Sequence, residues 1–246
     1  MKLTKCLSIS LVLLTLYNYG QSNLHDFSVI KADEWFLQKT DSLVAIGQQT
    51  VHYDLHDLAE NHQLQVINRE IKTFSEKGKR GVSFSSNENN GIAWLQELAF
   101  SNGIIELDIK GRDILQQSFV GIAFHGKDEK IFDAIYFRPF NFKSSDPVRN
   151  IHAVQYVSLP NNDWKKLRDE HNGIYEKAVL PAPDPSGWFH ATIEVHFPLI
   201  KVYVNSNKEP SLTVEQLNTV KSGRIGLWVG NNSDGSFANL TIRTFN

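Results

Sequence analysis

The stretch WFHATIEVHF, residues 188–197, is the clearest indication of the fold class because apolar and polar side chains alternate along it. One face holds Phe189, Ala191, Ile193, Val195 and Phe197. Alternation with a period of two residues is typical of a β-strand that buries one face and exposes the other. We therefore predict a half-buried strand here.

The same alternation recurs in IELDIK (105–110) and IKVYVN (200–205). Further strands are expected near residues 80–86, 91–100, 117–126, 133–140, 152–158, 224–229 and 236–245, and turn signals such as NNG (89–91) separate most of them. Many short strands without long helical repeats favour an all-β fold over a parallel α/β sheet. The expected architecture is an antiparallel two-sheet jelly-roll sandwich.

Two segments interrupt this strand pattern. Residues 21–70 give mixed signals and are interpreted as an N-terminal extension, so the sandwich domain is placed at residues 71–246. Residues 159–187 form a long irregular loop that contains Trp164. Within this loop, Asn162 or Asp163 is positioned to cap a short helix that ends near His171. Loops of this length are often functional.

The composition is that of a folded globular protein. Among 246 residues there are 25 Lys and Arg against 27 Asp and Glu, which gives a formal net charge of −2. This balance lacks the basic excess that binding to a phosphate backbone needs, so nucleic acid is excluded as a partner. Aromatic residues make up 11% of the chain and are prominent in the candidate site.

Residues 1–20 are typical of a secretory signal peptide. Lys2 and Lys5 precede an apolar run over residues 7–16, which polar residues follow. The run is shorter than the about 20 apolar residues that span a bilayer. We therefore expect an exported protein, periplasmic or extracellular, with no membrane insertion after the signal is cleaved. Cys6 is the only cysteine and would be lost with the signal, so the mature chain has no disulfide.

Strand parity predicts one group of polar side chains on a sheet face. Along 118–125 the parity opposite the apolar residues ends in His125, and on the next strand Tyr136 and Arg138 share a face. Gln155 is the polar member of the strand after that. If these three strands are neighbours, the four side chains converge on a concave surface, and Trp228 from a later strand joins them.

Such a surface suits a saccharide. Aromatic rings stack on the apolar face of a pyranose, while Arg and Gln bind its hydroxyls. In a second interpretation, Tyr136 and Arg138 line a sheet face that the long loop covers, with Trp164 as its plug. For the acidic residues that follow His125, namely Asp128, Glu129 and Asp133, the alternatives are a Ca²⁺ site with loop carbonyls or solvated loop charges. No residue is assigned as a metal ligand.

Five segments carry a resemblance to a known group of proteins: SFVGIAFHG (118–126), DAIYFRPFNF (133–142), AVQY (153–156), WFHA (188–191) and IGLWVGN (225–231). They resemble exported bacterial proteins of the concanavalin A-like, laminin G-like sandwich superfamily, in particular the 3-keto-disaccharide hydrolase domain group. The resemblance implies a jelly roll with a sugar-facing concave sheet and covers about residues 75–245.

The strand at 105–110 invites a second comparison, with the carboxylate strand of glycoside hydrolase family 16. Glu106 and Asp108 match its first two acidic positions, but Lys110 stands where the shorter motif needs its second Glu. A retaining mechanism uses two carboxyls about 5–5.5 Å apart. Alternating charge on an exposed strand explains the same residues.

Three functions follow from these patterns. The first is an exported sandwich that binds a saccharide on its concave sheet face without catalysis. The second is a hydrolase or lyase acting on 3-keto or other glycosides, with His125 as base and Arg138 stabilising the oxyanion. In both, Tyr136, Gln155, Trp164 and Trp228 bind the sugar. The third is an adhesion or scaffold module with a flat face. The sequence predicts no oligomeric state.

Overall fold

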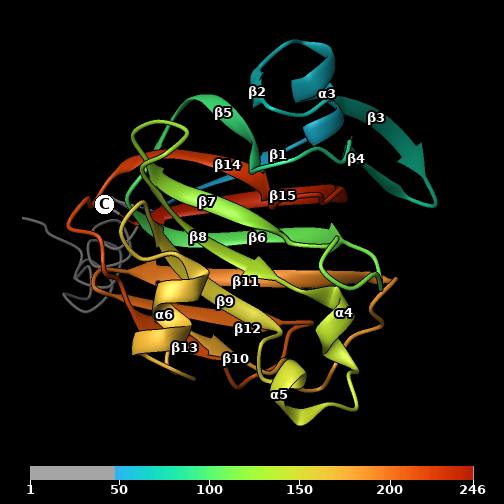
Figure 1. The fold of residues 1–246 in the computed structure, drawn as a ribbon. Helices are drawn as coiled ribbons and strands as arrows, with labels where there is room; N and C mark the ends of the chain where they lie inside the picture. The colour runs from blue at the N-terminus through green and yellow to red at the C-terminus, as the bar shows by residue number, and fades with distance from the viewer. Residues whose placement is uncertain (1–47, 246) are drawn as a thin grey trace, which may run out of the picture. The chain divides into compact units, whose positions relative to one another are not determined.

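The computed structural model describes residues 48–245. It consists of two sheets, one of eight strands and one of seven, with every named strand pair antiparallel (Figure 1). The predicted all-β, two-sheet antiparallel sandwich is confirmed. The predicted signal peptide, residues 1–20, lies outside the described residues, as does most of the predicted extension.

The first sheet has eight strands. In their order across the sheet they are β13 (Leu212–Glu215), β12 (Leu199–Val204), β11 (Trp188–His196), β6 (Asn102–Lys110), β15 (Gly235–Phe245), β4 (Lys79–Phe84) and β3 (Ile71–Glu76), and β1 (Gln48–Tyr53) pairs with β15. The stretch 188–196 is its strand β11, with Phe189, Ala191, Ile193 and Val195 buried as predicted.

The second sheet has seven strands and carries the candidate site. Their order is β10 (Glu176–Lys177), β9 (Val154–Leu159), β8 (Phe132–Phe137), β7 (Val120–Gly126), β14 (Gly223–Val229), β5 (Gly91–Phe100) and β2 (Leu64–Ile67). The strands that contain His125, Tyr136 and Gln155 are therefore neighbours, which was the condition for the predicted site.

The sheets begin earlier in the chain than the predicted sandwich boundary at residue 71. Strand β1 runs from Gln48 to Tyr53 and pairs with β15, while Leu64–Ile67 pairs with β5. Strand β1 is mostly polar and β2 has only four residues, so their sequences lack the clear alternation of the central strands. The rest of the expected division into domains stays a prediction.

The main core lies between the two sheets. One parity of each central strand enters it, for example Ile105, Leu107 and Ile109 from β6, and Val120 and Ile122 from β7. Burying a side chain of this size stabilises the fold by about 1.5–3 kcal/mol. This core fixes the register of both sheets, since a shift by one residue would expose every core side chain.

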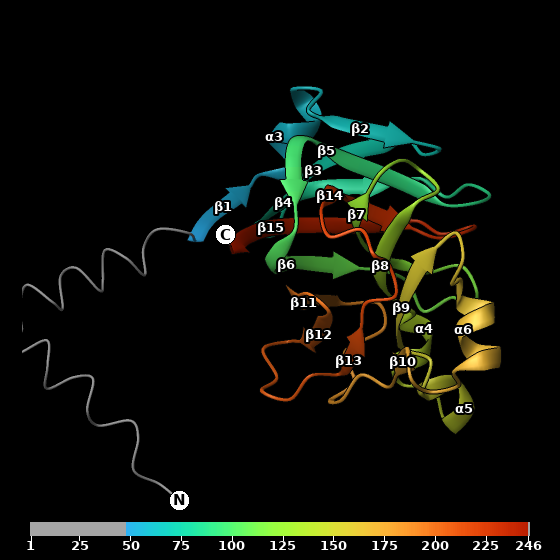
Figure 2. The ribbon, with the colours of Figure 1, turned by 90° about the vertical axis from the view of Figure 1, so that its left-hand side faces the viewer.

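The seven-stranded sheet is buried on its outer face as well. Ala134, Tyr136 and Trp228 belong to a second apolar cluster there, together with Leu167 of helix α6 (Trp164–Glu170). Figure 2 shows α6 beside β9, on the side of this sheet away from β11 and β12. The backbone N–H of Lys166 donates to the side chain of Asp163, as expected for the predicted N-cap of a short helix.

Three further helices are short: α3 (Leu55–Glu60), α4 (Pro139–Phe142) and α5 (Pro147–Asn150). Helix α4 begins directly after Arg138, so the chain leaves strand β8 beside the candidate site. Within residues 48–245, none of the helices is long and apolar enough to cross a membrane.

Candidate functional site

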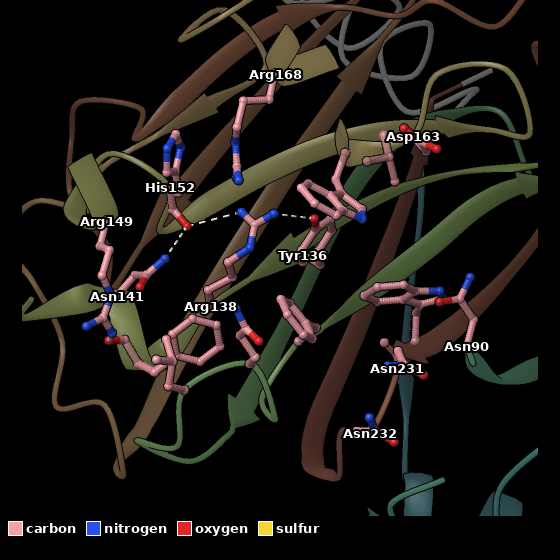
Figure 3. Close-up of a pocket in the computed structure, with 18 of the residues that line it drawn as sticks. Asn90, Tyr136, Arg138, Asn141, Arg149, His152, Asp163, Arg168, Asn231 and Asn232 are labelled. Atoms are coloured by element: carbon pink, nitrogen blue, oxygen red, sulfur yellow. Dashed lines mark hydrogen bonds between the residues drawn. The ribbon is translucent and has the colours of Figure 1, made fainter. Parts of the chain in front are cut away.

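A pocket with a volume of about 730 Å³ opens on the outer face of the seven-stranded sheet (Figure 3). Its floor includes Tyr136 of β8, Val157 of β9 and Trp228 of β14. Helix α6 contributes Trp164 and Arg168 to its walls. The pocket thus draws on three neighbouring or nearly neighbouring strands and on the loop that the sequence singled out as long and irregular.

A hydrogen-bonded triad of Tyr136, Arg138 and Gln155 lies at the base of this pocket. Gln155 stands opposite Tyr136 in the pairing of β9 with β8, and Arg138 follows two residues later on the same face. Nη2 of Arg138 donates to the hydroxyl of Tyr136 over 2.6 Å, and that hydroxyl donates to Oε1 of Gln155 over 2.8 Å. Arg138 also donates to the same Gln155 oxygen. Strand register therefore produces a fixed polar group.

Burial sets the charge states of this triad. Tyr136 is 3% exposed and Arg138 is 4% exposed. Burial raises the pKa of the Tyr136 hydroxyl, which keeps the phenol neutral, and burial lowers the pKa of Arg138. A guanidinium nevertheless stays protonated in proteins. The pocket base therefore presents a neutral phenol beside a desolvated cation.

Glu176 of strand β10 provides the negative charge behind the pocket. Its two carboxylate oxygens accept from Nε and Nη2 of Arg168 at 2.8 Å and 2.7 Å. Nδ1 of His152 lies 2.8 Å from one of these oxygens, and Nη1 of Arg138 lies 3.7 Å from it. Burial is the larger influence on His152 and lowers its pKa, although Glu176 acts in the opposite direction. His152 is therefore neutral near pH 7.

Aromatic side chains line the pocket from its floor to its rim. The ring of Trp228 lies 5.0 Å from that of Tyr136, and the ring of Phe119 lies 6.1 Å from Tyr136. The Arg138 guanidinium carbon lies 4.8 Å from the Tyr136 ring centre. At the rim, Trp164 is 48% exposed. The lining therefore offers both buried and accessible apolar ring surface.

Asparagines form the opposite rim, which strand parity did not predict. Asn90, Asn231 and Asn232 line the pocket from two loops (Figure 3). The buried guanidinium of Arg69 joins these loops, because Nη2 donates to the carbonyls of Asn89 at 2.7 Å and Gly230 at 2.8 Å. These loops are far apart in sequence and no periodic pattern links them. The sequence feature that could have indicated this rim is the clustering of asparagines at residues 87–90 and 231–232.

The structure brings together five of the six residues that the sequence proposed for the site. Tyr136, Arg138, Trp164 and Trp228 line the pocket. Gln155 is fully buried and acts from behind, through its bonds to Tyr136 and Arg138. Trp164 stands at the rim and is exposed, so it does not plug the site. The long loop nevertheless covers part of this sheet face, through Leu167 of helix α6.

The structure places His125 away from the pocket. It is fully buried, with its ring stacked 5.9 Å from that of Phe100. Nε2 lies 2.7 Å from the carbonyl oxygen of Ser101, and because a carbonyl only accepts, Nε2 carries the proton. Nδ1 then accepts from Gln216 at 2.9 Å.

A bulge accounts for this displacement. The pairing of β7 with β14 shifts register between Arg224 and Gly226, and His125 has a φ of 52°. An extra residue in a strand re-aims the side chains around it. The parity argument that gave His125 the direction of Tyr136 therefore fails at this position, and we do not assign it a contact with a ligand.

The acidic groups singled out in the sequence also lie elsewhere. Asp128 accepts from the backbone N–H groups of Lys130 and Ile131, while buried Asp133 accepts from Tyr156 and Gln216. One oxygen of Asp128 and both oxygens of Asp133 are therefore used by protein donors. Asp108, from the strand compared with family 16, lies in the eight-stranded sheet and binds Lys79, His190 and Asn239.

Comparison with known proteins identifies the fold. No protein-family model and no curated protein matches the sequence. Among solved structures, the chain is similar to carbohydrate-binding module CBM66 from Bacillus subtilis, with a TM-score of 0.53 and 16% identity over 72% of this chain and 93% of that one. The chain is also similar to a Bacillus subtilis protein of unknown function with a galectin-like fold. The TM-score is 0.52 and the identity is 12%, over 80% of this chain and 96% of that one.

The exoplasmic/lumenal domain of VIP36, in a metal-free form, is also similar, with a TM-score of 0.50 and 8% identity over 75% of this chain and 85% of that one. Likeness at such identities concerns the fold. The protein has a concanavalin A-like, galectin-like β-sandwich, which confirms the fold expected from the sequence.

Proposed function

We propose that this protein binds a saccharide, without hydrolysing it, in the pocket lined by Tyr136, Trp164 and Trp228. The observation that carries the proposal is the pairing of aromatic rings with buried, mutually bonded polar groups in one pocket. Rings stack on the apolar faces of sugars, and fixed polar groups bind the hydroxyls. The likeness in fold to a carbohydrate-binding module supports the same function.

The chemistry of the lining favours binding over hydrolysis. Hydrolysis of glycosides generally uses two carboxyl groups that flank the scissile bond. Of the carboxylates in residues 48–245, Asp163 is the one that lines the pocket. The other polar groups of the pocket lining are hydrogen-bond donors and acceptors of arginine, asparagine and tyrosine side chains. Such groups suit the binding of sugar hydroxyls.

Isothermal titration with a panel of oligosaccharides tests this proposal. Trp164→Ala removes an exposed ring and should weaken the affinity for the oligosaccharide that binds by about tenfold, which corresponds to ~1.4 kcal/mol. Trp188→Ala is the matched control, because Trp188 belongs to β11 of the other sheet. Equal affinity of Trp164→Ala and wild type would contradict the proposed site. Release of new reducing ends would contradict the non-catalytic part.

The proposal includes export, with residues 1–20 removed. It rests on the charged and apolar zones of the N-terminus. Mass spectrometry of the protein made in a bacterial host should find a chain shortened by about 20 residues outside the cytoplasm, the length expected of a signal peptide. A full-length chain that stays in the cytoplasm would contradict export.

A further inference from the structure

The pocket has an excess of positive charge, which the arginine cluster Arg138, Arg149 and Arg168 supplies. Among the described residues, Asp163 is the only carboxylate in its lining. Glu176 adds a second negative charge from beneath, at 2% exposure. Figure 3 shows the guanidinium groups of Arg138 and Arg168 pointing toward one another, while Arg149 lies to one side of them, beside Asn141. Three guanidinium groups are thus balanced by only two carboxylates, those of Asp163 and Glu176.

The buried carboxylate is already used by one member of this cluster. Both oxygens of Glu176 accept from Arg168, within 2.8 Å. Arg138 approaches the same carboxylate only to 3.7 Å, and its hydrogen bonds go to neutral oxygens of Tyr136, Gln155 and the His152 backbone. The charge of Arg138 is therefore removed from water and only partly balanced by the protein.

Two buried hydrogen-bond donors of the pocket lining lack an acceptor. Nε of Arg149 and Nε1 of Trp228 have no hydrogen-bond partner among the described residues. The Arg149 side chain makes one hydrogen bond, from Nη2 to the carbonyl of Phe140 over 3.2 Å. A buried donor without a partner is unfavourable. A ligand with acceptor oxygens and a negative charge would offset the excess positive charge of this lining.

We propose that the saccharide bound in this pocket is acidic, and that the arginine cluster binds its carboxylate or sulfate group. This inference rests on the proposed function, since it names the class of sugar for the same pocket. Arg149 is the member best placed to discriminate, because its guanidinium keeps an unused donor. Guanidinium groups bind planar carboxylates and sulfates through paired N–H groups.

Matched oligosaccharides test the inference. Titration calorimetry compares three tetrasaccharides of galactose chemistry: neutral galactotetraose, tetragalacturonate and a sulfated galactotetraose. We expect one of the two acidic ligands to bind at least tenfold more tightly than the neutral one, and the preference to fall when NaCl is raised. The carboxylate and the sulfate are thereby distinguished as sources of the charge.

Substitution of Arg149 identifies the group that confers the preference. Arg149→Gln should reduce the preference for the acidic ligand at least tenfold, while Arg149→Lys should retain part of it. Arg243→Gln is the control, because Arg243 lies on β15 in the other sheet. Urea denaturation checks that each variant is folded.

The outcomes separate this inference from the proposed function. Equal or tighter binding of the neutral ligand would overturn the acidic class and leave saccharide binding intact. An acidic preference unchanged in Arg149→Gln would overturn the assignment to the arginine cluster. If none of the three ligands, nor any member of the wider neutral panel, binds, both proposals fail.

Discussion

The hydroxyl of Tyr136 accepts a 2.6 Å hydrogen bond from the guanidinium of Arg138, and both side chains are almost fully buried. The two residues are held in place before any ligand arrives, because Gln155 bonds to both of them. A site whose polar groups are already ordered loses less conformational freedom when it binds. The triad is thus ordered in the absence of a ligand.

Tyr136→Phe tests the triad. The change removes the acceptor for Arg138 and the donor to Gln155, so the free energy of unfolding should fall by about 1–2 kcal/mol. Urea denaturation measures this loss. The same change at Tyr203, whose hydroxyl lies on the other sheet and donates to Glu194 over 3.3 Å, should cost less than about 0.5 kcal/mol. Equal losses in the two variants would refute the special role of the triad.

Arg69→Ala tests the anchoring of the asparagine rim. Without its guanidinium, the carbonyls of Asn89 and Gly230 lose their shared donor. The two loops are then joined by weaker direct contacts, such as the hydrogen bond from the Asn89 N–H to Oδ1 of Asn231, and should become more mobile. We expect the oligosaccharide affinity to fall at least tenfold, because Asn90 and Asn231 belong to these loops. Calorimetry measures the affinity, and amide hydrogen exchange in residues 87–90 and 230–232 should increase. Unchanged exchange in both loops would show that Arg69 does not hold them.

His125→Gln separates stability from binding. The buried imidazole bonds to Ser101 and Gln216, so its replacement should lower the free energy of unfolding by about 1–3 kcal/mol. The affinity for the oligosaccharide should stay within twofold of wild type, because His125 does not line the pocket. Lost binding in a folded variant would restore a functional role for this residue.

The opposite pKa shifts of Asp108 and His190 predict that the free energy of unfolding is highest in mildly acidic solution. Burial of Asp108 opposes its ionisation, but hydrogen bonds from His190, Lys79 and Asn239 outweigh burial and lower its pKa from 3.8 to about 2. Its contribution, about 2 kcal/mol, is complete above pH 3.8 and is lost as the pH falls through about 2.

His190 acts with the opposite sign. The hydrogen bond to Asp108 is the main cause that raises its pKa above 6.5. Its stabilisation is therefore complete below pH 6.5 and is lost as the pH rises through the folded value. Urea denaturation from pH 2 to 9 should show both losses, and His190→Gln should abolish the decline on the alkaline side. A decline that persists unchanged in this variant would contradict the assignment.

The sequence was sufficient to predict the strands in which apolar and polar residues alternate clearly. Residues 188–196 show why, since a core on one side alone imposes a period of two on the chain. The edge strands at 48–53 and 64–67 could not be located from the sequence, because short edge strands bury too few residues to impose a pattern.

The site was predicted where parity holds and missed where it does not. Tyr136, Arg138 and Gln155 follow strand parity and pairing, and they meet. His125 sits at a bulge, whose position depends on the partner strand rather than on local sequence. Asn90 and Asn231 meet because Arg69 and direct hydrogen bonds, such as the one from the Asn89 N–H to Oδ1 of Asn231, join two loops. Such tertiary contacts leave no periodic signal.

The indole N–H resonances of a ¹⁵N-labelled sample give the most direct test of saccharide binding in this pocket. On titration with an oligosaccharide that binds, the signals of Trp164 and Trp228 should shift progressively, because both residues line the pocket. The signal of Trp188, on the other sheet, should stay in place. A shift of Trp188 with Trp164 and Trp228 unmoved would contradict the account.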